Sequence, residues 1–204
     1  MNSSPVVFLA TLLLAPTALA ISKTELSVQG IITPSACDPV VSSGGVVDYG
    51  KMTAKELNPE QPTSLPPQFL RLSIQCEGPT MLAFDTTDNR AGSSINQYRH
   101  GLGMTPSNEK LGSVSFHLRN PVADGVPVRT LNSMDGGVSW VPSTMLSFFT
   151  LTAIAAAGNS STPIPFTRFD ADMQLHTAID GTDRLTVLDE IPMDGHATLQ
   201  MKYL

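Results

Sequence analysis

Residues 195–204 alternate between apolar and polar side chains, and this pattern constrains the fold more than any other stretch of the sequence. Successive side chains of an extended chain point to opposite faces, so the alternation predicts a half-buried β-strand. The side chains expected on its buried face are Ala197, Leu199, Met201 and Tyr203. Such a strand packs one face against a core and leaves a backbone edge, which we predict is covered by a separate polypeptide.

Residues 1–20 have the features of a secretory signal peptide. Their apolar run, residues 6–15, is shorter than the about 20 residues that a membrane-spanning helix needs. Ala18 and Ala20 form the small-x-small pattern of a cleavage site, although residues 2–20 contain no Lys or Arg. We therefore expect export with cleavage after Ala20. A non-cleaved anchor is the alternative, against which the short run and Pro16 both argue.

Residues 21–204 are enough for one domain with a substantial core. Charged residues make up 15% of the sequence, below the roughly 25% of typical domains. The 16 Pro and 15 Gly are spread along the chain, which suits a sheet protein with many turns. The net charge is -6 and no cluster of Lys or Arg occurs, which argues against a nucleic-acid partner.

Cys37 and Cys76 are the two cysteines of the chain. In an exported protein an isolated pair favours a disulfide. A redox pair would place its cysteines about one turn apart, and a zinc site would need more ligands nearby. The sequence therefore predicts a structural bridge between these two residues.

Short alternating or apolar segments recur between turn-forming residues. Leu26, Val28, Gly30 and Ile32 share one face of a further expected strand. Other strands are expected at 46–50, 69–76, 80–84, 112–119, 127–131, 147–157, 173–179 and 185–188. Residues 147–157 suit a strand buried on both faces or a short buried helix, and 51–68 and 85–110 are expected to be mostly irregular. Short strands at this spacing indicate an all-β sandwich.

Several of these segments resemble chaperone–usher fimbrial subunits. Residues 26–37 are similar to the first strand of those proteins, which carries a Gly and ends at a Cys bridged to a second Cys, here Cys76. Residues 45–50 resemble their next short strand, and the penultimate Tyr203 matches their chaperone-recognition motif. More closely, the chain resembles the proteobacterial fimbrial-like secreted family of unknown function, which ends in a Gly-x-Ala-Thr-type strand.

This resemblance implies an all-β, immunoglobulin-like β-sandwich that lacks its last strand, with one intramolecular disulfide. The implied pilin-like domain spans 31–204 and follows an N-terminal extension, residues 21–30. In such proteins a periplasmic chaperone lends the missing strand, and the extension of the next subunit then replaces it. The implied donor residues are Leu26, Val28 and Gly30, and the implied chaperone or acceptor strand carries Ala197, Leu199, Met201 and Tyr203.

The function implied is a structural subunit of a fimbria or pilus that contributes to cell adhesion. Its partners would be the periplasmic chaperone, an outer-membrane usher and neighbouring subunits in a head-to-tail polymer. Export would run through the periplasm to the cell surface. The alternative is a self-contained secreted β-sandwich that binds protein, or carbohydrate stacked on Trp140 or Tyr98.

Enzymatic activity has little support in the sequence, so we expect no catalytic residues, metal or cofactor. The four His are scattered, without a His-x-x-x-His pair or a glycine-flanked Ser elbow. Asp170, Asp172 and His176 lie close enough in sequence to be considered as a metal site. In a strand, however, these three side chains would form one solvated face, which is the interpretation we favour.

Overall fold

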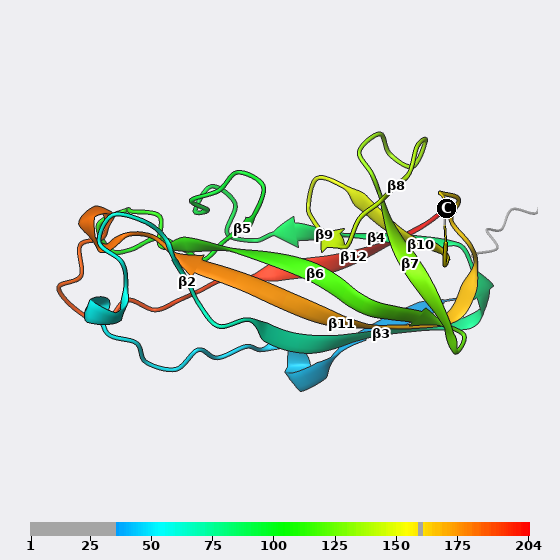
Figure 1. Cartoon of the computed structure of the whole chain (residues 1–204), viewed down its shortest axis with the longest axis horizontal. Coiled ribbons are helices and arrows are strands. Elements are labelled where there is room, and N and C mark those ends of the chain that lie inside the picture. Colours follow the sequence, from blue (N-terminus) through cyan, green and yellow to red (C-terminus); the bar gives the residue numbers. More distant parts are fainter. Residues whose placement is uncertain (1–35, 159–160) are drawn as a thin grey trace, which may run out of the picture. The chain divides into compact units, whose positions relative to one another are not determined.

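The computed structural model describes residues 36–158 and 161–204, and the regular secondary structure of this part of the chain is β-strand apart from three short 3-10 turns (Figure 1). The strands are β1 Cys37–Val41, β2 Thr63–Ser64, β3 Gln68–Thr80, β4 Leu82–Asp88, β5 His100–Gly101, β6 Gly112–Ala123, β7 Val126–Ser133, β8 Val141–Pro142, β9 Met145–Leu146, β10 Leu151–Ala156, β11 Phe166–Ile179 and β12 Ala197–Tyr203. Short 3-10 turns occupy Ser42–Gly45, Ala54–Glu56 and Thr182–Arg184. The predicted all-β fold is confirmed. In the described ranges no helix is long and apolar enough to cross a membrane.

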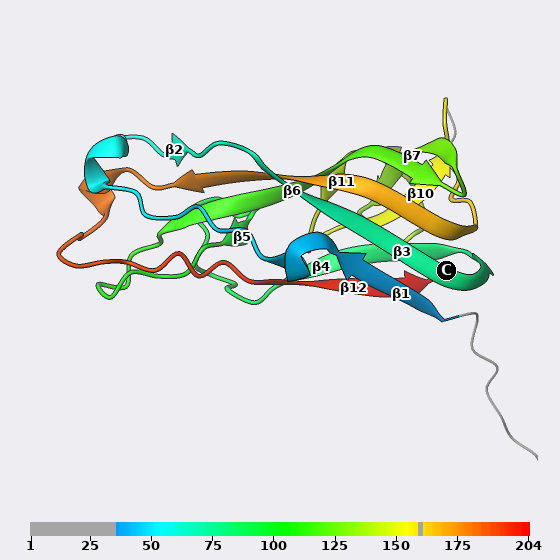
Figure 2. The same cartoon turned by 90° about the horizontal axis from the view of Figure 1, so that it is seen from below.

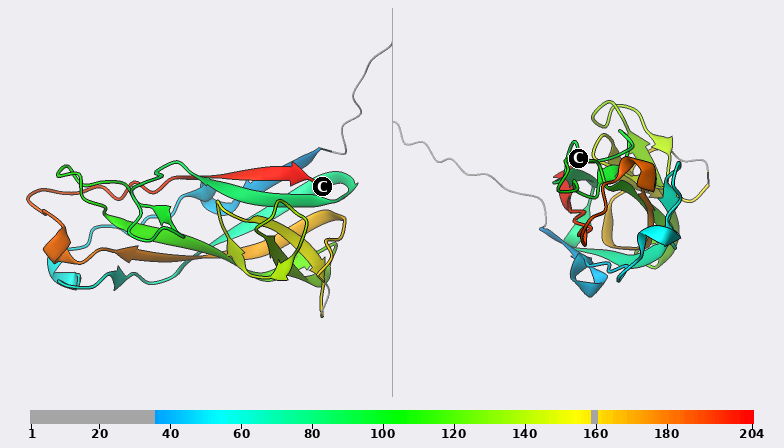
Figure 3. Two further views of the ribbon diagram at one scale, coloured as in Figure 1. Left: turned by 90° about the horizontal axis from the view of Figure 1, so that it is seen from above. Right: turned by 90° about the vertical axis from the view of Figure 1, so that its left-hand side faces the viewer.

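One curled antiparallel sheet forms the body of the domain. Its strand order is β1-β3-β11-β6-β7-β10-β4-β12. β6 and β7 pair only next to their shared turn, at Val122–Pro127 and Ala123–Val126. Beyond this corner the sheet folds back, so that the first four strands face the last four across the core, as the end-on view in Figure 3 shows. The result is a two-layered sandwich made from a single sheet.

Alternating side chains of the long strands fill the space between the two layers. On β3, Leu70, Leu72, Ile74 and Cys76 are buried, while the residues between them are more exposed. Three phenylalanines form the centre, with the ring of Phe169 on β11 lying 5.8 Å from both Phe84 and Phe166. The expected alternation at 69–76 and 173–179 therefore reflects real inward and outward faces.

Two predicted strands are wrong. Residues 46–50 follow a turn in which Ser43, Gly44 and Gly45 have positive φ, and they have no ladder in the described part of the chain. Residues 185–188 also lack a ladder, and Leu188 is 87% exposed although Leu185 is buried. Both segments are apolar enough for a strand, but among the described residues neither has a neighbouring strand to pair with.

Elsewhere the structure contains a strand where one was predicted, but with different first or last residues. Thr80 belongs to the end of β3, and β4 begins only at Leu82. The apolar segment 147–157 contains a strand and not a helix, and β10 is buried from Leu151 to Ala155. The predicted signal peptide, the extension 21–30 and its donor residues Leu26, Val28 and Gly30 lie outside the described residues.

Candidate functional site

The predicted disulfide is confirmed and secures one edge of the sheet. Cys37 and Cys76 are directly opposite each other in the β1–β3 pair, with their Cα atoms 4.0 Å apart. Both side chains are buried in the core. Because β1 has only five residues, the bridge to β3 is its strongest attachment to the domain.

The two strands at the ends of the strand order, β1 and β12, are open edges, and Figure 2 shows them on the same side of the domain. Within the described residues, β1 pairs only with β3, and β12 pairs only with β4. The two strands run in opposite directions, since the first residue of β1 lies near the last residue of β12: the Cys37 N–H donates to the Tyr203 hydroxyl at 3.3 Å. The domain therefore carries two strand edges that face each other across a gap.

The free backbone groups of β12 belong to the residues whose side chains point inward. Asn89 N–H donates to the His196 carbonyl, and Leu204 N–H donates to the Met81 carbonyl, so these even-numbered residues bond towards β4. Alternate residues of an antiparallel strand bond to opposite sides. The N–H and C=O groups that face the gap are consequently those of Ala197, Leu199, Met201 and Tyr203.

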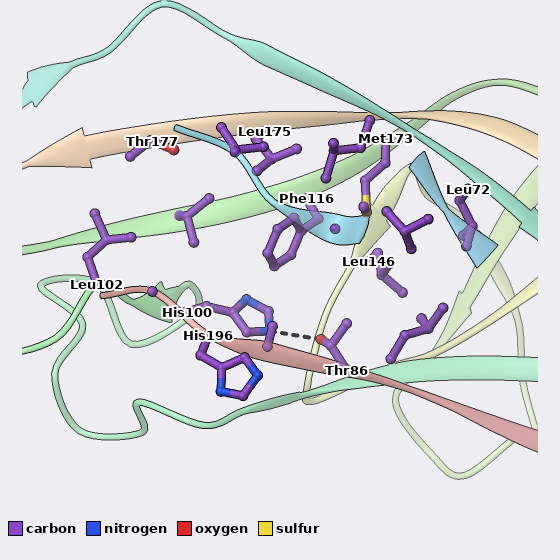
Figure 4. A pocket seen from close by; sticks show the side chains of 18 of the residues that line it. Leu72, Thr86, His100, Leu102, Phe116, Leu146, Met173, Leu175, Thr177 and His196 are labelled. Carbon is purple, nitrogen blue, oxygen red and sulfur yellow. Dashed lines mark hydrogen bonds between the residues drawn. The ribbon is translucent and has the colours of Figure 1, made fainter. Parts of the chain in front are cut away.

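An apolar cavity of about 270 Å³ lies between the two edges, and we call it the groove (Figure 4). One rim is formed by Val41, Val47 and Tyr49, and the other by Met193, Ala197 and Leu199. Its floor includes Leu72, Phe116, Leu146 and Leu175, which come from β3, β6, β9 and β11. The groove is therefore lined by side chains from both layers of the sandwich, and Leu72, Leu146 and Leu175 of its floor are buried.

Both rims are fixed to the rest of the domain by polar contacts. Tyr49 donates its hydroxyl to Thr177 Oγ1 at 2.8 Å, which holds the segment after β1 against β11. Arg90 forms an ion pair with Asp194, and Asp194 N–H donates to the Leu102 carbonyl. These contacts fix the segment that enters β12, so the groove is a preformed feature.

A buried histidine lies on the polar side of the groove floor. His100 Nε2 is 2.8 Å from Thr86 Oγ1, and the imidazole lies edge-on to the rings of Phe116 and Phe148. Burial lowers the pKa of His100 below its ordinary value, and the charge of Asp88 and a backbone hydrogen bond to Val114 offset this in part. His100 is therefore held neutral under the floor.

This burial predicts a pH-dependent stability. Because the folded-state pKa of His100 lies below the 6.5 of the exposed side chain, the unfolded chain binds the proton more readily. The stabilisation is present above that value and is lost as pH falls through the lowered pKa. We expect the free energy of unfolding, measured in urea from about pH 7.5 to about pH 5, to fall less steeply for His100→Gln than for wild type.

His117→Gln is the matched control, because burial also lowers the pKa of His117. Removing His117 should leave the part of the slope due to His100 in place. Parallel pH curves for His100→Gln and wild type would show that His100 is not held neutral in the folded state.

Other polar clusters considered in the sequence have structural partners. Asp170 accepts from Ser73 and Arg168, and Asp172 accepts from Asn120. His176 lies edge-on to His117 on the half-exposed outer face of β11 and β6. Over residues 36–158 and 161–204, no group of three or more His, Cys, Asp or Glu side chains is arranged to hold a metal ion.

The two aromatic residues considered for carbohydrate differ in their surroundings. Trp140 is half-buried against Ala83, Leu151 and Ala153, and its indole N–H donates to the Gly137 carbonyl at 3.0 Å. Tyr98 is 59% exposed and lies edge-on to Phe149. Only Tyr98 therefore presents a ring to a ligand.

Two of the four predicted acceptor residues line the groove and two lie beyond it, and Tyr203, predicted on the buried face, is 44% exposed. Ala197 and Leu199 line it, Met201 packs against the core beyond it, and Tyr203 reaches across to Cys37. Sequence reasoning missed the opposite rim, although Val47 and Tyr49 showed the alternation that would place them on one face. No sequence signal marked Met193 or His100 as groove residues.

Comparisons with known proteins reveal distant relatives. A family model described as a protein of unknown function (DUF1120) matches residues 26–98, which include both cysteines. Protein GltF of Escherichia coli (strain K12) is 26% identical over 225 residues, covering 89% of this chain and 88% of that protein. The uncharacterized protein YhcF of the same strain is 24% identical over 240 residues, covering 100% of both chains. The chain is thus similar, over most or all of its length, to proteins whose names state no activity.

Proposed function

We propose that this chain is a structural subunit of a fimbria-like filament, which accepts the N-terminal segment of a neighbouring copy as a strand in its groove. The observation that carries this proposal is the pair of open edges, β1 and β12, on either side of an apolar floor. Unpaired strand edges invite pairing with another chain. A peptide that adds a strand gains affinity from backbone hydrogen bonds and specificity from alternate side chains in pockets.

The occupant we propose is the segment 21–30 of a second copy. Leu26, Val28 and Gly30 recur at every second position, so an extended chain would point all three at the groove floor. Burying a large apolar side chain contributes roughly 1.5–3 kcal/mol. Ten extended residues span at most about 36 Å, which makes this segment long enough to follow β12. A contact of this head-to-tail kind does not close on itself and builds a filament.

The partners and route follow from the same proposal. A periplasmic chaperone would fill the groove before assembly, an outer-membrane usher would exchange it for the next subunit, and the filament would mediate cell adhesion at the surface. The signal-peptide pattern of residues 1–20 and the fimbrial resemblance support this route. We assign no catalytic role, because the polar side chains near the groove are explained by packing and hydrogen bonding.

A second candidate function rests on Tyr98. As a self-contained secreted module, the domain would bind carbohydrate by stacking a sugar on this exposed ring, beside Asn96 and Gln97. This alternative leaves the groove without a role, whereas the filament proposal uses it. The strand-acceptor function is therefore the one that the geometry supports best.

Deleting residues 23–28 tests the proposal. If these residues serve a neighbour, the variant should keep its disulfide and unfold at nearly the wild-type temperature, yet form no polymers. If they belong to their own domain, the deletion removes the burial of Leu26 and Val28 and costs several kcal/mol of a marginal stability. Size-exclusion chromatography and thermal unfolding of periplasmic protein distinguish these outcomes.

A matched pair of double variants shows whether the face of the segment matters. Leu26→Asp with Val28→Asp places two charges on the face proposed to enter the groove, and should abolish polymers. Ser27→Asp with Gln29→Asp adds the same charge to the opposite face, and should retain them. Loss of polymers in both, or in neither, would contradict the donor role of this segment.

A further inference from the structure

The two edges of the groove differ in the hydrogen-bond donors that they offer. On β1, Glu77 N–H donates to the Ala36 carbonyl, so Ala36, Asp38 and Val40 bond towards β3. The groups that face the groove are therefore those of Cys37, Pro39 and Val41. The Cys37 N–H confirms this alternation independently, because it points away from β3 to the Tyr203 hydroxyl.

Most of the β1 donors facing the groove cannot pair with an incoming strand. The Cys37 N–H already donates to Tyr203 Oη at 3.3 Å. Pro39 has no N–H, which breaks a regular ladder at the centre of the strand. The remaining donor is the N–H of Val41, which lies directly before the turn in which Ser43 and Gly44 have positive φ. A strand lying along β1 could thus accept only one regular backbone N–H from these three residues. Their carbonyl groups can still accept from it, so a ladder along β1 would be interrupted.

The edge of β12 offers a complete row of donors and acceptors. Ala197, Leu199 and Met201 each have an N–H and a C=O on the side away from β4. None of the residues of β12 is a proline. The same three side chains are half-buried and point towards the core. A strand added here would gain both a ladder and contact with the groove.

Tyr203 separates the two edges at one end of the groove. Neighbouring strands of a sheet lie about 4.8 Å apart, but here a whole tyrosine side chain bridges the two backbones. β1 and β12 therefore do not pair directly at this end, and the ring occupies the path of any strand that would continue between them.

We infer that an incoming strand forms its continuous hydrogen-bond ladder with β12, packs against β1 without a regular ladder, and ends where Tyr203 Oη meets Cys37 N–H. Tyr203 then sets the register, because it fixes where the incoming strand ends. Pro39 determines which edge carries the ladder, because it interrupts pairing along β1. This inference rests on the proposed strand-acceptor function and adds which edge recognises the partner. It requires of the partner a continuous backbone ladder on the β12 side, and apolar contact with at most isolated hydrogen bonds on the β1 side.

Two proline substitutions, one on each edge, test the inference. Leu199→Pro removes an N–H that faces the groove and takes no part in the β4 ladder, and Val41→Pro does the same on β1. The probe is a fluorescent peptide of residues 21–32, titrated into the full chain. We expect affinity to fall about tenfold for Leu199→Pro, as loss of a ladder bond implies. Because Val41 lines the groove, its proline variant is compared with Val41→Ala, which keeps the N–H, and Val41→Pro should weaken binding no more than Val41→Ala does. Leu199→Ala keeps the N–H and should weaken binding less than Leu199→Pro does.

Amide exchange followed by NMR gives a readout that needs no variant. Peptide binding should slow exchange at Leu199 and Met201 and leave the rate at Val41 unchanged, while Cys37 keeps the protection that it has in the free protein. This result decides the matter even where Leu199→Pro fails to fold, which near-ultraviolet circular dichroism would reveal.

The outcomes separate the two proposals. A greater loss of affinity from Val41→Pro than from Val41→Ala, or new protection at Val41, would overturn the assignment of the regular ladder to β12 while leaving the strand-acceptor function in place. Loss of Cys37 protection on binding would show that the strand displaces Tyr203, which overturns the inferred end point. No binding of the peptide to the wild-type chain would remove the inference together with the proposed function.

Discussion

Phe169→Ala should lower the free energy of unfolding by about 3–5 kcal/mol. The Phe169 side chain is fully buried on β11, the strand that joins β3 to β6. Its ring touches Phe84 of the opposite layer and Phe166 of its own strand, each at 5.8 Å. Truncation leaves a cavity where the two layers meet. Urea denaturation with an unchanged m-value would measure the loss as a lower midpoint.

Phe69→Ala is the matched control for this prediction. Phe69 lies on the neighbouring β3 but points outward, with 60% of its surface exposed. The same truncation should therefore cost less than about 1 kcal/mol. Equal losses for the two variants would mean that the layers do not pack through Phe169 as described.

The long strands could be predicted because burial leaves a periodic trace in the sequence. Leu70, Leu72 and Ile74 alternate with polar residues since one face of β3 meets the core and the other meets solvent. The pairing of Cys37 with Cys76 was predictable for a different reason, because the chain has two cysteines and a bridge needs both.

Strand pairing was harder to predict, because it depends on neighbours far away in the sequence. Residues 46–50 and 185–188 have the composition of strands, yet no strand of the described part of the chain forms a ladder with either of them. Short strands such as β2 form where a loop lies next to a long strand, here β11. A strand of two residues is too short to show an alternating pattern in the sequence.

The candidate site was predictable on one rim only. The alternation of residues 195–204 identified Ala197 and Leu199 as inward-facing, and both line the groove. That Val47 and Tyr49 face them follows from the order of eight strands around the curled sheet, which no local pattern encodes. His100 reaches the floor from a two-residue strand within a long irregular segment.

Replacing both cysteines, Cys37→Ser with Cys76→Ser, should destabilise the domain by about 4 kcal/mol on the loop-entropy model. The bridge closes a loop with a sequence separation of 39, so its loss frees the unfolded chain. The double variant is preferable to a single one, since it leaves no free thiol. Thermal unfolding with and without reductant measures the effect: reductant should destabilise wild type to the level of the variant and leave the variant unchanged.

The same replacement should also weaken the groove, because β1 is a five-residue edge strand held on one side by β3. Without the bridge, β1 can separate from β3 and take the rim at Val41 with it. The contact between Cys37 N–H and Tyr203 would then be lost too. We therefore expect weaker binding of the peptide 21–32 at temperatures well below unfolding, although the ladder donors of β12 are untouched. Full affinity in a folded double variant would show that β1 adds little to the groove, and that β12 and the floor bind the strand by themselves.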